Sequence, residues 1–143
     1  MNTTLVWVAP DATFAELLKL MDARGIHHLL VVRPDQVSSE RTLADRLPLN
    51  AIAGIVSSRD LVRELARRDD VAQASGSLLA KDLMHRAPLV TATPDLTLHE
   101  AAQTLRAERL SALPVTDERG HELVGIVTQE DLLTALALKV AEG

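Results

Sequence analysis

The sequence predicts an α+β fold, with mixed α/β character, built from two similar halves of the order β-α-β-β-α. Two duplicated strings predict it. Residues 10–16 (PDATFAE) reappear as residues 94–100 (PDLTLHE), and residues 54–61 (GIVSSRDL) reappear as residues 125–132 (GIVTQEDL). Such self-similarity in a chain of 143 residues indicates two small repeated units.

The first half begins with a short β-prone run at residues 5–8, which a Pro-Asp turn ends. A helix follows, because Thr13 and Glu16 have capping-box spacing and the next apolar residues recur at helical intervals. Gly25 is placed to end that helix. A strand at residues 26–32 comes next.

The second half repeats this order. It predicts a strand at residues 89–91, a helix after the capping-box pattern at residues 97–100, and a strand at residues 110–115. A turn at residues 117–120 then makes a hairpin with a strand at residues 121–127.

Each half ends where a strand gives way to a helix at a hydroxyl residue. Ser57 and Thr128 hold this position, and Asp60 and Asp131 follow three residues later. The final helices of the two halves are predicted over residues 60–67 and 131–140.

The first half has extra, largely polar residues in its hairpin loop, within about residues 34–50. We therefore expect one repeat over residues 1–69 that contains this insert, a connector over residues 70–85 with one short helical turn, and a second repeat over residues 86–143. A loop of that length is more often functional or mobile than idle, and the sequence does not decide between the two.

A three-stranded sheet with helices on one face leaves its other face half-covered, so neither repeat should be very stable alone. We expect the repeats to pack sheet to sheet with pseudo-twofold symmetry. Clefts then form where the two halves meet.

Composition excludes several classes of protein. Apolar residues make up 47% and charged residues 24%, which is ordinary globular usage and excludes overall disorder. The net charge of −5 has the wrong sign for general nucleic-acid binding, and Trp7 and Phe14 alone cannot build stacking platforms for bases.

The absence of cysteine excludes disulfides and thiolate metal sites. No basic residue precedes the apolar stretch before Pro10, and this stretch is too short for a signal peptide or a membrane span. We therefore expect a cytoplasmic protein without membrane insertion. The histidines lack metal-site spacing, and no nucleophile, base or metal arrangement can be named. We therefore expect no metal, no catalytic residue and no enzymatic activity.

The two Ser/Thr-x-x-Asp patterns allow two interpretations. A hydroxyl and free backbone N–H groups at a helix start form a site for phosphate, and an Asp three residues later can accept hydrogen bonds from ribose hydroxyls. Nearby aliphatic residues then suit adenine. The alternative is purely structural, because the same spacing forms a capping box.

Four strings in order carry a family resemblance: residues 81–84 (KDLM), residues 93–98 (TPDLTL), residues 111–115 (SALPV) and the GIV-[ST]-x-x-DL string of both halves. The chain resembles a tandem pair of cystathionine β-synthase (CBS) domains, also called a Bateman module, from Leu5 to about Val140.

The resemblance implies a regulatory, signal-transducing module that requires no cofactor. Its relatives commonly bind AMP, ADP, ATP, NAD or S-adenosylmethionine in two clefts, regulate an effector protein or an attached domain that this chain would lack, and form homodimers. The alternative is a dimerisation or docking module with vestigial clefts and no nucleotide ligand.

Carried over by position, each cleft takes residues from both halves. The first cleft combines Ser57, Asp60, Ile55, His85, Leu89, Val90 and Ala112. The second combines Thr128, Asp131, Ile126, Leu5, Val6 and His28, where protonation of His28 below about pH 6.5 would favour phosphate. The two clefts are not equivalent, because residues 27–30 (HHLL) differ from residues 111–114 (SALP).

The last predicted helix is apolar on more than one face, which favours a second partner for it. We expect self-association through such a surface. The apolar positions are Leu132, Leu133, Leu136, Leu138 and Val140.

Overall fold

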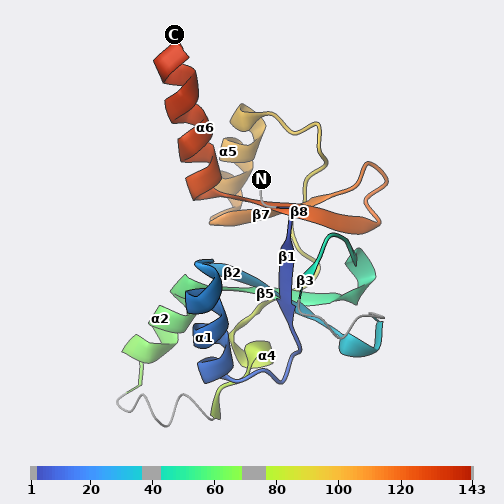
Figure 1. Ribbon diagram of the computed structural model, residues 1–143, viewed down its shortest axis with the longest axis vertical. Helices are drawn as coiled ribbons and strands as arrows, with labels where there is room; N and C mark the ends of the chain where they lie inside the picture. Colours follow the sequence, from blue (N-terminus) through green and yellow to red (C-terminus); the bar gives the residue numbers. More distant parts are fainter. Residues whose placement is uncertain (1–2, 37–42, 69–76, 143) are drawn as a thin grey trace. The chain divides into compact units, whose positions relative to one another are not determined.

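The computed structural model describes residues 3–36, 43–68 and 77–142, and the chain divides into two compact units (Figure 1). The N-unit comprises Val6–Ala44 and Asn50–Leu89. The C-unit comprises Met1–Leu5, Asp45–Leu49 and Val90–Gly143. Both units combine helices with a sheet, so the predicted α+β class is confirmed.

Among the described residues, the N-unit sheet has the strand order β3-β1-β2-β5-β6. Strand β1 (Leu5–Val8) runs parallel to β2 (His28–Val32), and β5 (Ile52–Ser57) runs antiparallel to β2. The two edge strands are short: β3 (Leu43–Ala44) lies beside β1, and β6 (His85–Arg86) pairs antiparallel with β5.

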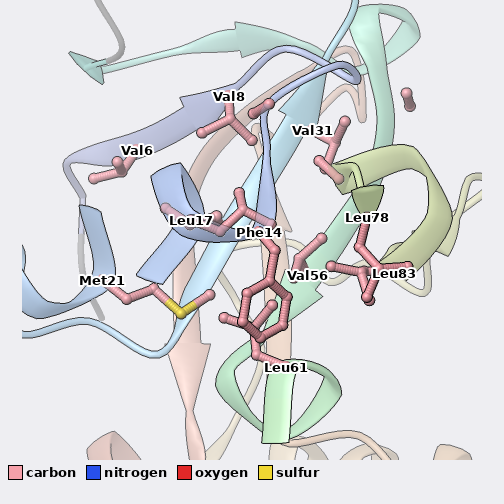
Figure 2. Close-up of a cluster of buried hydrophobic side chains, with 14 residues drawn as sticks. Val6, Val8, Phe14, Leu17, Met21, Val31, Val56, Leu61, Leu78 and Leu83 are labelled. Carbon is pink, nitrogen blue, oxygen red and sulfur yellow. The ribbon is translucent and has the colours of Figure 1, made fainter. Parts of the chain in front are cut away.

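Three helices enclose the hydrophobic core of the N-unit: α1 (Phe14–Arg24), α2 (Ser58–Ala66) and the short α4 (Ala80–Leu83). Figure 2 shows this core, in which side chains from the helices meet alternate residues of the strands. Its labelled members are Val6, Val8, Phe14, Leu17, Met21, Val31, Val56, Leu61, Leu78 and Leu83. The predicted helical turn in the connector is therefore α4, packed into this unit.

The ends of α1 follow the sequence signals. The Glu16 N–H donates to Thr13 Oγ1 at 3.2 Å, and the Thr13 N–H donates to the Glu16 carboxylate at 3.4 Å, which completes the predicted capping box. Gly25 ends the helix with a φ of 62°, in the left-handed region that glycine enters without strain.

In the C-unit, β7 (Ala112–Thr116) and β8 (Glu122–Thr128) form the predicted hairpin, and β4 (Leu47–Pro48) pairs antiparallel with β8. Helices α5 (Leu98–Glu108) and α6 (Gln129–Glu142) contribute to a hydrophobic cluster of this unit. Its buried members are Ala101, Leu105, Leu113 and Leu132.

The register of the strands confirms the repeat. His28 lies opposite Ser57 in the N-unit, as Ala112 lies opposite Thr128 in the C-unit. Both pairings also shift register at the same place, after Val31 and after Val115. The two halves thus share one hairpin geometry.

The strand predicted at residues 89–91 does not form, and this prediction was wrong. Ala92 alone makes a parallel bridge to Val115, with its N–H donating to Pro114 O at 3.0 Å and its carbonyl accepting from Thr116 N–H at 2.7 Å. In this parallel register the Val90 carbonyl would next need the N–H of residue 114, which proline lacks. The ladder therefore stops at one bridge.

The insert is more than the stretched hairpin loop that was predicted, because it contributes β3 to one sheet and β4 to the other. Arg46 lies 3.3 Å from the carboxylate of Glu122 and 3.9 Å from that of Asp117. The Leu49 N–H donates to His121 O at 2.8 Å. Residues 37–42 of the insert lie outside the described part of the chain.

Among the described residues, no helix is long and apolar enough to cross a membrane.

Candidate functional site

The candidate site of the N-unit lies where β5 gives way to α2. Ser57 is the N-cap, and its side chain accepts a hydrogen bond from the Asp60 N–H at 3.3 Å. The Asp60 carboxylate in turn accepts from the Ser57 N–H at 2.8 Å and from the Ser57 hydroxyl at 2.9 Å, both on Oδ2. The structural interpretation of this pair as a capping box is thus confirmed.

Asp60 is unusual because its carboxylate is nearly buried, at 6% exposure. Its second oxygen, Oδ1, lies 3.2 Å from Nε2 of His85 and 3.8 Å from a guanidinium nitrogen of Arg63. A buried carboxylate needs such partners, because burying an unpaired charge is costly.

The position of His85 depends on Gly54. In the register of β5 with β6, Gly54 lies opposite Arg86 and Ile55 opposite His85. A Cβ on Gly54 would lie 2.5 Å from the His85 carbonyl oxygen and 2.7 Å from the sulfur of Met84. Only a residue without a side chain lets the backbone of β6 approach this closely.

The equivalent site of the C-unit has the same reciprocal cap. The Asp131 N–H donates to Thr128 Oγ1 at 3.1 Å, and the Thr128 N–H donates to Asp131 Oδ2 at 2.9 Å. Asp131 is half-buried, whereas Asp60 is nearly buried. The two acidic positions therefore differ, as the sequence differences between the halves lead one to expect.

Of the residues predicted for the first cleft, the structure brings Ser57, Asp60 and His85 into direct contact. Ile55 pairs with His85 across β5 and β6. Leu89 is half-buried in the same unit, whereas Val90 (38% exposed) and Ala112 (buried opposite Thr128) belong to the C-unit.

Of the residues predicted for the second cleft, Thr128, Asp131, Ile126 and Leu5 belong to the C-unit, and Val6 and His28 to the N-unit. Leu5 and Ile126 are buried. The Val6 side chain points into the N-unit core (Figure 2). His28 is half-buried opposite Ser57.

The sequence reasoning missed the bond between Asp60 and His85, and the role of Gly54 in it. The sequence does contain one signal, since Gly54 lies inside an otherwise apolar strand, where glycine marks the close approach of another backbone. Among the described residues, no group of three or more His, Cys, Asp or Glu side chains could hold a metal ion.

Comparison with known proteins places this geometry in a family. A profile of the CBS domain matches residues 1–38 and 80–138. Inosine-5'-monophosphate dehydrogenase of Korarchaeum cryptofilum is 33% identical over 126 residues, which cover 87% of this chain and 26% of that enzyme. The chain thus spans about a quarter of the length of this curated relative.

Two solved structures show the same fold. The CBS domain pair of protein MJ0100, in complex with 5'-methylthioadenosine and S-adenosyl-L-methionine, aligns with a TM-score of 0.69 and 21% identity over 94% of this chain and 93% of that one. CBSX2 in complex with AMP aligns with a TM-score of 0.62 and 24% identity over 96% of this chain and 90% of that one. The chain belongs to the CBS domain family and is a tandem CBS, or Bateman, module.

Proposed function

We propose that this chain is a regulatory module that binds an adenosine-containing ligand in clefts between its two repeats and transmits occupancy to an effector. The candidate ligands are AMP, ADP, ATP, NAD and S-adenosylmethionine. The observation that carries the proposal is the duplicated hydroxyl-and-carboxylate pair at a helix start, Ser57 with Asp60 and Thr128 with Asp131. First-turn N–H groups and a hydroxyl suit a phosphate, and the carboxylate suits a ribose diol.

The comparisons support this choice of ligand class. Two similar structures contain AMP in one case and 5'-methylthioadenosine with S-adenosyl-L-methionine in the other, and these ligands share the adenosine group. The matching dehydrogenase is more than three times as long as this chain, which supports a regulatory rather than a catalytic role for the matched part. We infer no enzymatic activity for the CBS pair itself.

Thermal unfolding with a panel of adenosine compounds tests the proposal. A ligand at about 100 times its Kd stabilises the folded state by about 2.7 kcal/mol, which raises Tm by roughly 5–10 °C for a chain of this size. We expect Asp60→Asn or Asp131→Asn to abolish the part of the shift that comes from its own cleft. Glu108→Gln, at an exposed position of α5, is the control.

A flat panel would favour the second candidate function, a dimerisation or docking module. One observation supports a self-association surface: α6 exposes four large aliphatic side chains, Leu133, Leu136, Leu138 and Val140. Leu133, Leu136 and Val140 recur at helical intervals along one side of α6, and we propose that this face is covered in a homodimer. Dimerisation and ligand binding are compatible, so each has its own test.

A further inference from the structure

The Asp60 carboxylate already has partners at both of its oxygens. Ser57 donates twice to Oδ2, through its N–H and its hydroxyl, and both bonds are local to the start of α2. Oδ1 contacts His85 Nε2 at 3.2 Å, and that contact joins residues 25 positions apart in the sequence. A ribose hydroxyl that donates to Asp60 is therefore directed to Oδ1, where it meets His85 and Arg63.

His85 is the partner that can leave. Its side chain is 63% exposed, whereas that of Asp60 is 7% exposed. It extends from β6, a two-residue edge strand, so rotation into solvent disturbs no core packing. By contrast, removing Ser57 from Oδ2 would break the cap of α2.

Histidine is also the partner whose charge changes near neutral pH. Arg63, the other cation near Oδ1, lies on α2 itself at 3.8 Å and keeps its charge throughout. In β6, Arg86 follows His85 directly and so lies on the opposite face of the strand. In β5, the residues that pair with β6 are the uncharged Gly54 and Ile55.

Two further elements that contact β5, α4 and β2, carry charged or titratable residues. On α4, the Asp82 carboxylate accepts the Leu79 N–H at 3.0 Å, and Lys81 is an exposed neighbour of that residue. On β2, His28 lies opposite Ser57 in the ladder. His85 and Arg63 lie against Oδ1, at 3.2 and 3.8 Å, and of these two side chain types only histidine changes its charge near neutral pH.

We infer that His85 is a displaceable counter-ion of Asp60, whose protonation weakens adenosine binding at the Asp60 site and leaves the Asp131 site unaffected. This inference rests on the proposed function. Protonated His85 stabilises the ligand-free state through a charge-assisted hydrogen bond that the ribose must replace. Affinity therefore falls as the pH drops through the histidine range, and by linkage ligand binding releases protons.

The test uses 5'-methylthioadenosine, because it has no phosphate whose own charge would change with pH. The full chain carrying Asp131→Asn isolates the Asp60 site, and titration calorimetry compares pH 6 with pH 8. We expect about threefold to tenfold weaker binding at pH 6. Adding His85→Ala should reduce this ratio to about one and abolish proton release, which calorimetry in two buffers of different ionisation enthalpy detects.

The matched control carries Asp60→Asn and keeps the Asp131 site, where we expect no pH dependence with or without His85. If binding occurs and its pH dependence survives His85→Ala, the role of His85 is refuted while the proposed function stands. If 5'-methylthioadenosine and the rest of the adenosine panel bind to no variant at either pH, both are refuted.

Discussion

Asp60 and Asp131 occupy equivalent positions in the two repeats, yet their surroundings differ. Asp60 is 6% exposed and contacts Ser57, His85 and Arg63, whereas the carboxylate of half-buried Asp131 bonds to Thr128. The two aspartates have the same place in their repeats and different surroundings. A substitution of one is therefore the control for the same substitution of the other.

We expect Asp60→Ala to destabilise the chain by about 2–3 kcal/mol, because it removes a cap and leaves the half-buried Ser57 hydroxyl without its acceptor. Asp131→Ala removes a cap at a half-buried position and should cost about 1 kcal/mol. Urea denaturation followed by circular dichroism measures both. Equal costs would contradict the inequivalence of the two sites.

Gly54→Ala tests the close approach of β6. Alanine normally suits a strand better than glycine, but here its Cβ would lie 2.5 Å from the His85 carbonyl oxygen, which belongs to the backbone. We expect a loss of about 1–3 kcal/mol in the free energy of unfolding. A variant as stable as the parent chain, measured in urea, would show that β6 does not lie against this glycine.

Asp117 gives a prediction about pH. Its carboxylate accepts the His121 N–H at 2.9 Å, and this bond, together with the weaker one from Glu122 and the charges of His121 and Arg46, lowers its pKa below the usual 3.8. A lowered pKa stabilises the folded state well above pH 3.8, and this contribution is lost as the pH falls through the folded-state pKa. We expect Asp117→Asn to reduce stability more at pH 6 than at pH 2.5, as measured by urea denaturation.

Most elements follow from local sequence signals. The capping box at Thr13, the left-handed Gly25 and the hairpin turn that contains Gly120 are all specified within a few residues, and the structure confirms them. The missing strand at residues 89–91 is different, because its absence depends on a donor that Pro114 lacks in the neighbouring strand. A propensity argument confined to one segment cannot detect a missing partner in another.

Pro114→Leu is expected to extend this ladder. The new N–H of residue 114 can donate to the Val90 carbonyl, as the parallel pairing of β1 with β2 suggests. The added hydrogen bond and the greater freedom of the unfolded chain roughly offset each other, so overall stability should change little. Hydrogen exchange tests this prediction, because the new hydrogen bond should protect the amide of residue 114. Rapid exchange of that amide would show that the bond to the Val90 carbonyl does not form.

The candidate site was predictable to a similar degree. The Ser/Thr-x-x-Asp pairs are local patterns, and both form the expected reciprocal hydrogen bonds. The contact of His85 with Asp60 was not predictable, because it requires β6 to pair with β5 in one particular register. The grouping of residues from both repeats into shared clefts stays a prediction.

At the scale of the whole molecule, the exposed aliphatic face of α6 predicts association. Leu133 is 67% exposed and Leu136 is 45% exposed. We expect the parent chain to sediment as a dimer, and the double variant Leu133→Glu with Leu136→Glu as a monomer, because burying two carboxylates without partners is unfavourable. Thr134→Glu adds charge at an exposed polar position of the same helix and should stay dimeric. A monomeric parent chain would remove the basis for a homodimer.

The strands β3 and β4 lie within a few residues of each other and join different sheets, while α4 and β6 complete the N-unit from beyond residue 76. Each unit is consequently assembled from stretches of polypeptide that are separate in the sequence. Cleaving the backbone between residues 69 and 76 would give two fragments, neither of which contains a whole unit. Separately produced fragments should therefore stay unfolded, and mixing them should restore the native circular dichroism spectrum.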